Sequence, residues 1–252
     1  MSTCSQKVRL VLAEKKLEFE SVILDLQSGA QFESGYLKLN PQAVVPTLVH
    51  HDQAITESTL INEYLEDCYP KPSLLPKTAV ERYQLRAFCK QLDDRLHPAC
   101  GVITYAIGAR PGLLTKPKAE LAALIAQIPD EARRRHRAMV IQDGVHAPIF
   151  ATALAQYLQV LNFAEAQLAL TPFLAGTQLS LADYALTPYV LRLEHLAMNT
   201  VMDRYPALVA WHRAIQQRDS YHVAIENWLP KAAVAGFKAA GEAVIAEIRF
   251  PD

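Results

Sequence analysis

Apolar positions close to the start of the chain recur every three or four residues, as on one face of a helix. The pattern predicts a helix from Ser5 to Lys16, so that residues 2 to 5 lie at its N-terminus. The positions that form its apolar face are Val8, Leu10, Val11, Leu12 and Leu17.

The segment that follows this helix mixes short apolar runs with turn residues. Val22 to Leu24 is a β-like run, and residues 31–39 suit one or two turns of helix. Asn40-Pro41 ends that helix, because a residue before proline is disfavoured in helical geometry.

Two further short apolar segments lie at residues 47–50 and 54–56, on either side of His51-Asp52-Gln53. This arrangement predicts a β-hairpin. From Ser58 to Tyr69 the apolar residues again recur at three and four, which predicts an amphipathic helix.

A proline-rich stretch, Pro70 to Pro76, carries three prolines in seven residues and interrupts regular structure. We place a domain boundary there, with an α/β domain at 1–76 and an all-helical domain at 77–252. The region from Ala109 to Ala147 is longer than a compact helical bundle needs, and it either covers a site or forms a loop. The helices expected after the boundary span 82–99, 118–128, 131–142, 148–168, 181–195, 206–218 and 230–248.

Composition narrows the function classes. The chain has 252 residues, 51% hydrophobic and 20% charged, with a formal net charge of -1. This near-neutral charge gives no field that attracts nucleic acid or an anionic membrane. The run Arg133 to Arg137 has acidic neighbours, so we interpret it as a solvated helix face.

Cysteine and histidine spacing excludes two further kinds of site. The four cysteines, at positions 4, 68, 89 and 100, have no disulfide or zinc spacing, and the eight histidines form no metal pattern. Without a secretory signal or a bilayer-length apolar run, we expect a cytoplasmic protein with reduced thiols and no metal.

Three motifs together resemble the glutathione-binding half of cytosolic glutathione transferases. They are the stretch Ser2 to Lys15 (STCSQKVRLVLAEK), the stretch Val44 to Leu48 (VVPTL), and Thr56 to Thr59 (TEST). The resemblance implies a thioredoxin-like domain followed by an all-helical domain, in a homodimer that uses glutathione as co-substrate. The segment Phe173 to Asp183 adds to it, because it is similar to the buried capping segment of the family's helical domain.

Three residues compete to activate the glutathione thiol. The resemblance assigns Ser2 to the zeta, theta and phi branches, Cys4 to the beta branch, and Ser5 to the bacterial β-aryl etherases. Lowering a thiol pKa by about 2 units requires about 2.7 kcal/mol. One hydroxyl hydrogen bond of about 1.5 to 3 kcal/mol, with a helix N-terminus, suffices. The alternative is that these residues only cap the helix.

The resemblance also implies the residues that hold glutathione. A cis Val45-Pro46 bond would expose the Val45 backbone to the cysteinyl part, and Glu57 and Ser58 would hold the γ-glutamyl end, with the carboxylate at a helix N-terminus. Gln42 is a weaker candidate for the glycyl end. The small hydrophobic electrophile would lie near Tyr105, Arg110, Phe150 and His97.

Several functional hypotheses stay open from the sequence. The reaction class is attack of a glutathione thiolate on an electrophilic carbon, by conjugation, isomerisation or ether cleavage. The competing hypothesis is a non-catalytic binding or scaffold protein, because the family's first β-strand is missing from the chain. We expect either that the true start lies upstream, or that Val22 to Leu24 fills the vacancy, or that a partner supplies a strand. A thioredoxin-type oxidoreductase is disfavoured, since no Cys-x-x-Cys pair is present.

Overall fold

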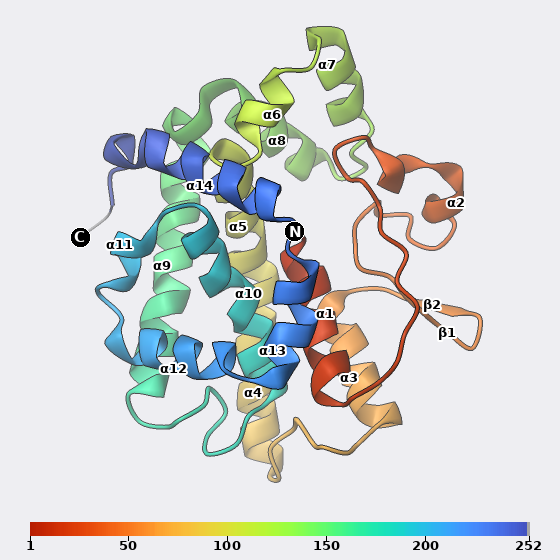
Figure 1. The fold of residues 1–252 in the computed structure, drawn as a ribbon, viewed down its shortest axis with the longest axis vertical. Coiled ribbons are helices and arrows are strands. Elements are labelled where there is room, and N and C mark those ends of the chain that lie inside the picture. Colours follow the sequence, from red (N-terminus) through yellow and green to blue (C-terminus); the bar gives the residue numbers. More distant parts are fainter. Residues whose placement is uncertain (251–252) are drawn as a thin grey trace.

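The computed structural model describes residues 1–250, and its first third has little sheet (Figure 1). Helix α1 runs from Thr3 to Glu14, and the short helix α2 from Ser34 to Leu37 follows a 3-10 turn at Ala30–Phe32. The predicted hairpin is confirmed as β1, Leu48–His50, paired antiparallel with β2, Gln53–Ile55. Helix α3, Ser58–Cys68, confirms the amphipathic helix.

The strand expected at Val22 to Leu24 is wrong. Among residues 1–250 the only sheet is the two-stranded hairpin, so this segment has no strand beside it with which to pair its backbone groups. Its side chains point to solvent, with Val22 81% and Ile23 79% exposed. The expectation that this run moves into the place of the family's first β-strand is therefore wrong.

Helices build the rest of the molecule (Figure 1). The predicted helix over 82–99 is interrupted by a π-helical turn at Leu92–Leu96, just before Pro98, which has no N–H to continue the ladder of hydrogen bonds. The long region from Ala109 to Ala147 is folded into three helices. In order, the helices are α4 Ala79–Gln91, α5 His97–Ala106, α6 Arg110–Leu114, α7 Lys118–Ala126, α8 Glu131–Asp143, α9 Pro148–Leu168, α10 Leu181–His195, α11 Asn199–Met202, α12 Pro206–Gln216, α13 Asp219–Ala224 and α14 Lys231–Val244.

The centre of the core is α10, in which every residue from Leu181 to Leu193 is buried. The predicted capping box at its start is confirmed: the Ser180 N–H donates to the Asp183 carboxylate at 2.9 Å. That carboxylate also accepts from Trp211 Nε1 at 2.9 Å and from the Leu174 N–H at 3.0 Å. The buried aspartate thereby joins α10, α12 and the loop before α10.

Helix α1 belongs to the first third of the sequence, but it packs among the helices of the rest. It contacts α13 and α10 as extensively as it contacts α3, and Leu10 and Val11 are fully buried there (Figure 1). A polar contact adds to this packing, because Arg218 before α13 forms an ion pair with Glu14 at 2.6 Å. The N-terminus of α1 is thus fixed by the helical part of the molecule.

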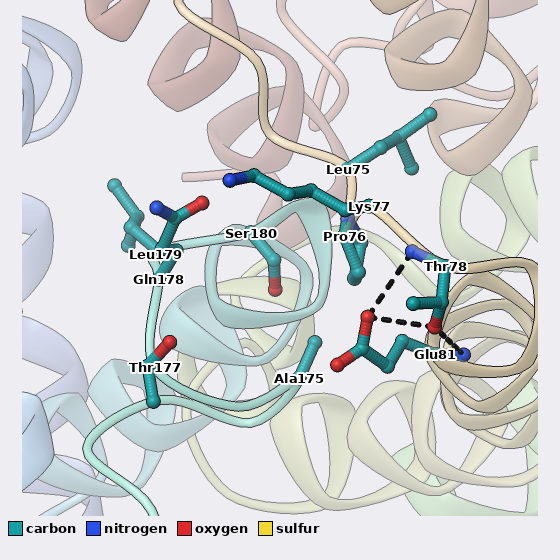
Figure 2. A pocket seen from close by; sticks show the side chains of 10 residues that line it. All are labelled: Leu75, Pro76, Lys77, Thr78, Glu81, Ala175, Thr177, Gln178, Leu179 and Ser180. Atoms are coloured by element: carbon teal, nitrogen blue, oxygen red, sulfur yellow. Dashed lines mark hydrogen bonds between the residues drawn. The ribbon is translucent and has the colours of Figure 1, made fainter.

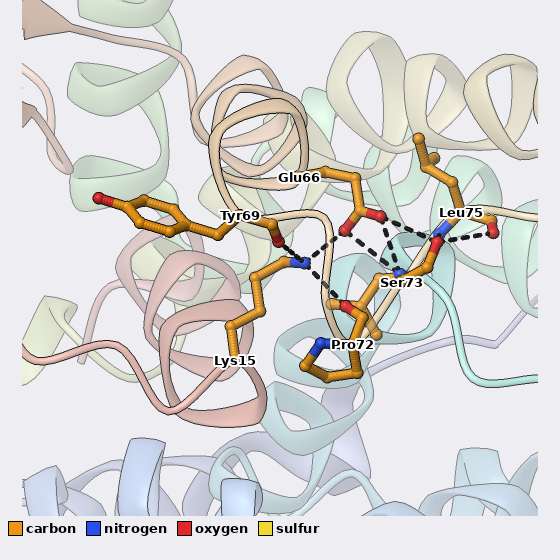
Figure 3. A network of polar contacts seen from close by, with 7 residues as sticks. Lys15, Glu66, Tyr69, Pro72, Ser73 and Leu75 are labelled. Carbon is orange, nitrogen blue, oxygen red and sulfur yellow. Dashed lines mark hydrogen bonds and ion pairs between the residues drawn. The ribbon is translucent and has the colours of Figure 1, made fainter.

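A buried ion pair fixes the proline-rich linker (Figure 3). Lys15 Nζ lies 2.6 Å from a Glu66 carboxylate oxygen, and both side chains are buried. The same ammonium donates to the carbonyls of Tyr69 at 2.7 Å and Pro72 at 2.9 Å, while Glu66 accepts from the Leu74 N–H at 3.1 Å. Each charge therefore has several partners, as a buried pair requires. The predicted boundary at Pro76 stays a prediction.

Candidate active site

The N-terminus of α1 presents two of the three predicted thiol-activating residues. Ser2 is the N-cap residue, with extended backbone, and its hydroxyl oxygen accepts a hydrogen bond from the Ser5 N–H at 3.2 Å. The capping interpretation is therefore correct for Ser2, but it uses only the acceptor side of the hydroxyl. A hydroxyl also has a proton to donate, so capping leaves Ser2 able to serve a thiolate. Ser5 lies half-buried in the first turn.

Cys4 contacts a residue that lies far along the sequence, at the start of α5. Its Sγ lies 3.4 Å from Nδ1 of His97, the first residue of α5. Burial alone raises the pKa of the Cys4 thiol, but the charge and hydrogen bond of His97, with Lys7 and the Ser58 hydroxyl, lower that pKa to about 6. Desolvation disfavours the charged imidazole, yet the Cys4 thiolate raises the pKa of His97. Each group therefore stabilises the charged form of the other, the thiolate of Cys4 and the imidazolium of His97.

Lys7, whose charge lowers the pKa of Cys4, was not predicted as a site residue. Its side chain is fully buried, with Nζ 3.0 Å from an Asp93 carboxylate oxygen and 5.1 Å from the centre of the Tyr189 ring. Lys7 follows Cys4 by one turn of α1, so its positive charge acts on the same side of the helix. The only available signal was a lysine inside an otherwise apolar helix face, which does not reveal whether the lysine is buried or paired.

The Val45-Pro46 bond is cis, as predicted. The preceding loop is held by Tyr36 and Asn40, whose side chains donate to the Val44 carbonyl at 2.5 and 2.8 Å. No backbone group within residues 1–250 bonds to the N–H or the C=O of Val45. These two groups are therefore available to pair with an extended peptide ligand.

Glu57 and Ser58 lie at the start of α3 in an unusual backbone conformation. Glu57 has φ 66° and ψ 107°, outside the common regions for a residue with a side chain, and its carboxylate caps no helix N–H. Strained residues of this kind concentrate at ligand-binding sites. Ser58 is buried next to Cys4, so the N-termini of α1 and α3 face the same sulfur.

The four residues expected around the electrophile are not all together. His97 contacts Cys4, and Tyr105 lies two turns further along α5 beneath the Arg137 guanidinium. Phe150 is instead a core residue. Arg110 donates to the carbonyls of Ile141 at 2.9 Å and Gln142 at 3.0 Å, so its role is to hold the end of α8.

Three further features lie apart from the candidate residues or are absent from the described residues. One cavity lies between the linker and the loop before α10, and its lining includes Thr78, Glu81 and Ser180 but none of the candidate residues (Figure 2). There, the Thr78 N–H donates to the Glu81 carboxylate at 3.2 Å and the Glu81 N–H donates to the Thr78 hydroxyl oxygen at 3.3 Å, which forms a capping box. Within residues 1–250 no group of three or more histidine, cysteine or acidic residues is placed to hold a metal ion. In that same range, no single helix is long and apolar enough to cross a membrane.

Comparison with known proteins identifies the family. Residues 1–68 match the model of the glutathione S-transferase N-terminal domain, and residues 131–219 match the model of its C-terminal domain. Glutathione S-transferase 3 of Zea mays is 31% identical over 85% of this chain and 85% of its own. The chain belongs to the glutathione S-transferase family. This result confirms the resemblance, and with it the expected combination of a thioredoxin-like N-terminal domain and a helical C-terminal domain.

Other relatives of this glutathione S-transferase are named for different reactions. The tetrachloro-p-hydroquinone reductive dehalogenase of Sphingobium chlorophenolicum is 30% identical over 90% of this chain and 94% of its own. A probable maleylacetoacetate isomerase of Vibrio cholerae is 28% identical over 82% of this chain and 83% of its own. The crystal structure of the β-etherase LigF from Sphingobium sp. strain SYK-6 superimposes with a TM-score of 0.81 at 26% identity, covering 89% of this chain and 95% of that one.

Proposed function

We propose that this glutathione S-transferase binds glutathione between α1, the cis-proline loop and α3, and activates its thiol for attack on a small hydrophobic electrophile. The observation that carries the proposal is the convergence of α1, α3 and α5 on the Cys4 sulfur. Two helix N-termini and the histidine at the start of a third helix stabilise negative charge at this point. The site therefore suits a thiolate.

Each predicted residue has a role in this proposal. The Val45 N–H and C=O pair with the cysteinyl part of glutathione, while Glu57 meets its ammonium group. The free N–H groups at the start of α3, with Ser58, hold the γ-glutamyl carboxylate. The Ser2 hydroxyl donates to the glutathione sulfur, with Cys4 as neighbour. Ser5 stays the alternative donor.

Titration calorimetry of the chain with glutathione tests the binding step. We expect micromolar to millimolar binding, which Glu57→Gln weakens. For the chemical step, turnover of aryl halides, cis-enoic acids and β-aryl ethers separates conjugation, isomerisation and ether cleavage. Ser2→Ala should reduce turnover more than Ser5→Ala. If the chain binds no glutathione at all, the non-catalytic scaffold hypothesis is favoured over the enzymatic one.

The acidic Cys4 thiol favours a second candidate, glutathione-dependent reduction. In this reaction the Cys4 thiolate attacks the glutathione sulfur of a mixed disulfide between glutathione and another thiol, forming a Cys4–glutathione disulfide and releasing that thiol as its thiolate. A free glutathione thiolate then attacks the Cys4–glutathione disulfide, which restores the Cys4 thiolate and forms glutathione disulfide. Mass spectrometry of the protein after incubation with glutathione disulfide tests it. A glutathione adduct that Cys4→Ser abolishes supports the reduction, and an adduct only on the exposed Cys68 excludes it.

The proposal also covers the oligomeric state of the protein and its location in the cell. We infer a homodimer in the cytoplasm, on the grounds of family membership. Sedimentation velocity of the purified chain tests the dimer.

A further inference from the structure

Helices α7 and α8 contact two loops of the first part of the chain, which lie near them in Figure 1. Arg133 in the first turn of α8 donates to the Gln42 carbonyl at 3.0 Å. Leu124 of α7 approaches Gly29 so closely that a Cβ at Gly29 would lie 3.0 Å from its Cδ1. The region from Ala109 to Ala147, for which the sequence suggested either a cover over a site or a loop, thus contacts the proposed glutathione-binding part directly.

The arginine run on α8 is not simply the solvated face that the sequence indicates. Arg135 fits that expectation, because it is exposed and forms an ion pair with Glu131 at 2.7 Å. Arg133 and Arg137 are half-buried on the opposite side, one helical turn apart. The difference arises because that side of α8 faces the Gln42 loop and Tyr105 instead of water.

Neither of these two cations has a carboxylate within ion-pair distance among residues 1–250. The Asp130 carboxylate accepts from the Arg133 N–H and acts on the Arg133 guanidinium by its charge alone. Arg137 stacks on the Tyr105 ring, and burial, with the repulsion from Arg133, lowers its pKa. Both guanidinium groups nevertheless stay protonated, since arginine does not lose its proton in proteins. Two partly desolvated guanidinium groups that no carboxylate contacts form a site that the carboxylate of a ligand would neutralise.

We infer that Arg133 and Arg137 bind a carboxylate of the substrate pair, and that its first source is the glycyl carboxylate of glutathione. This inference rests on the proposed function, and it deepens it by assigning the helical domain a part in holding glutathione. Gln42 precedes Val45 by three residues, so a peptide whose cysteinyl part pairs with Val45 would extend its glycyl end toward the Gln42 loop. Arg133 already contacts that loop.

The test compares three variants that remove the same charge from one helix. Arg133→Gln and Arg137→Gln remove the proposed receptor, and Arg135→Gln is the matched control. Glutathione and its glycyl monoethyl ester, in which the glycyl carboxylate is neutralised, are the ligands in calorimetry. We expect the receptor variants to weaken glutathione binding about tenfold or more, as for the loss of a charged hydrogen bond. Binding of the monoethyl ester should be unchanged in all three variants.

A carboxylate on the electrophile is the second source, and kinetics distinguishes it. The probes are 4-chloro-3-nitrobenzoate, which carries a carboxylate, and 1-chloro-2,4-dinitrobenzene, which is neutral. A rise in KM confined to the benzoate in Arg133→Gln or Arg137→Gln, with unchanged glutathione binding, supports the carboxylate site and assigns it to the electrophile.

The inference is overturned if both receptor variants match Arg135→Gln with every ligand. Far-UV circular dichroism and thermal unfolding establish that each variant is folded, and Arg133→Lys, which keeps the charge without the planar fork, should recover part of the binding. Should the unmodified chain bind no glutathione, the proposed function fails first; should it bind glutathione while the variants have no effect, only the carboxylate site fails.

Discussion

The first 76 residues and the helical remainder are stabilised in different ways. In the first part the hairpin strands have three residues each, and Val22, Ile23 and Val49 are exposed, whereas α10 in the second part is buried from Leu181 to Leu193. The candidate binding loops lie in the first part. They are held in place because α1 and α3 pack on the second part. The site therefore depends on a core that its own sheet does not supply.

The largest expected effect comes from separating the linker from α1. Lys15→Met leaves the buried Glu66 carboxylate without its cation, which should cost about 3 to 5 kcal/mol of unfolding free energy. Urea unfolding measures the loss, and glutathione binding should weaken with it. Lys90→Met, which breaks an exposed pair with Asp94, is the control and should cost less than about 1 kcal/mol. Equal effects of the two variants would contradict the special role of the linker anchor.

The second prediction concerns the helical core and pH. Burial, with the charge of Arg192, lowers the pKa of His195 to about 4, against an ordinary 6.5. Between pH 6.5 and pH 4 the His195 imidazole is protonated in the unfolded chain but neutral in the folded chain. The free energy of unfolding therefore decreases as the pH falls from 6.5 to 4. The full loss is about 3 kcal/mol. Urea unfolding at both pH values should show this loss, and His195→Asn should flatten the dependence. An equal slope in both proteins would show that His195 is not its source.

The third prediction tests the contact between the two parts at the site. His97→Asn removes the positive charge beside Cys4, so the midpoint of Cys4 alkylation by iodoacetamide should rise from about 6 by about 1 to 3 pH units. The measurement uses a Cys68→Ser background, because Cys68 is exposed. His146→Asn, which alters an exposed histidine far along the chain, should leave the midpoint unchanged. An unshifted midpoint in His97→Asn would remove His97 from the site.

The smallest expected effect concerns the exposed segment at residues 22–24, compared with the buried helix α10. Val22→Ser and Ile23→Ser should each change the unfolding free energy by less than about 0.5 kcal/mol, since both side chains already face water. Leu186→Ala in α10, where the side chain is fully buried, should cost about 2 to 5 kcal/mol. Serine variants that cost as much as the α10 variant would mean that the 22–24 segment is covered in solution.

Sequence patterns predicted those elements whose causes are local. The helix after Ser2, the hairpin around His51, the cis bond at Pro46 and the box at Ser180 each have a short-range signal, and all are confirmed. The strand prediction for Val22 to Leu24 was wrong because a strand forms only beside a partner strand. A local apolar run does not show whether such a partner is present.

The candidate site was only partly predictable for the same reason. Ser2, Cys4, Val45 and Ser58 were found through motifs, whereas the contact of Cys4 with His97 joins residues 93 positions apart. Nothing near Arg133 indicates that it will meet Gln42. Such contacts depend on how helices pack, and the spacing along the chain does not encode them.

The packing of α1 has a consequence for dissecting this protein. A fragment ending at Pro76 would carry Leu10 and Val11 without the surfaces of α10 and α13 that bury them. The complementary fragment would keep a matching apolar trough, together with an Arg218 deprived of Glu14. Each fragment would thus expose an apolar surface that is complementary to the other fragment. The two fragments should therefore associate when mixed, and each alone should aggregate or stay unfolded.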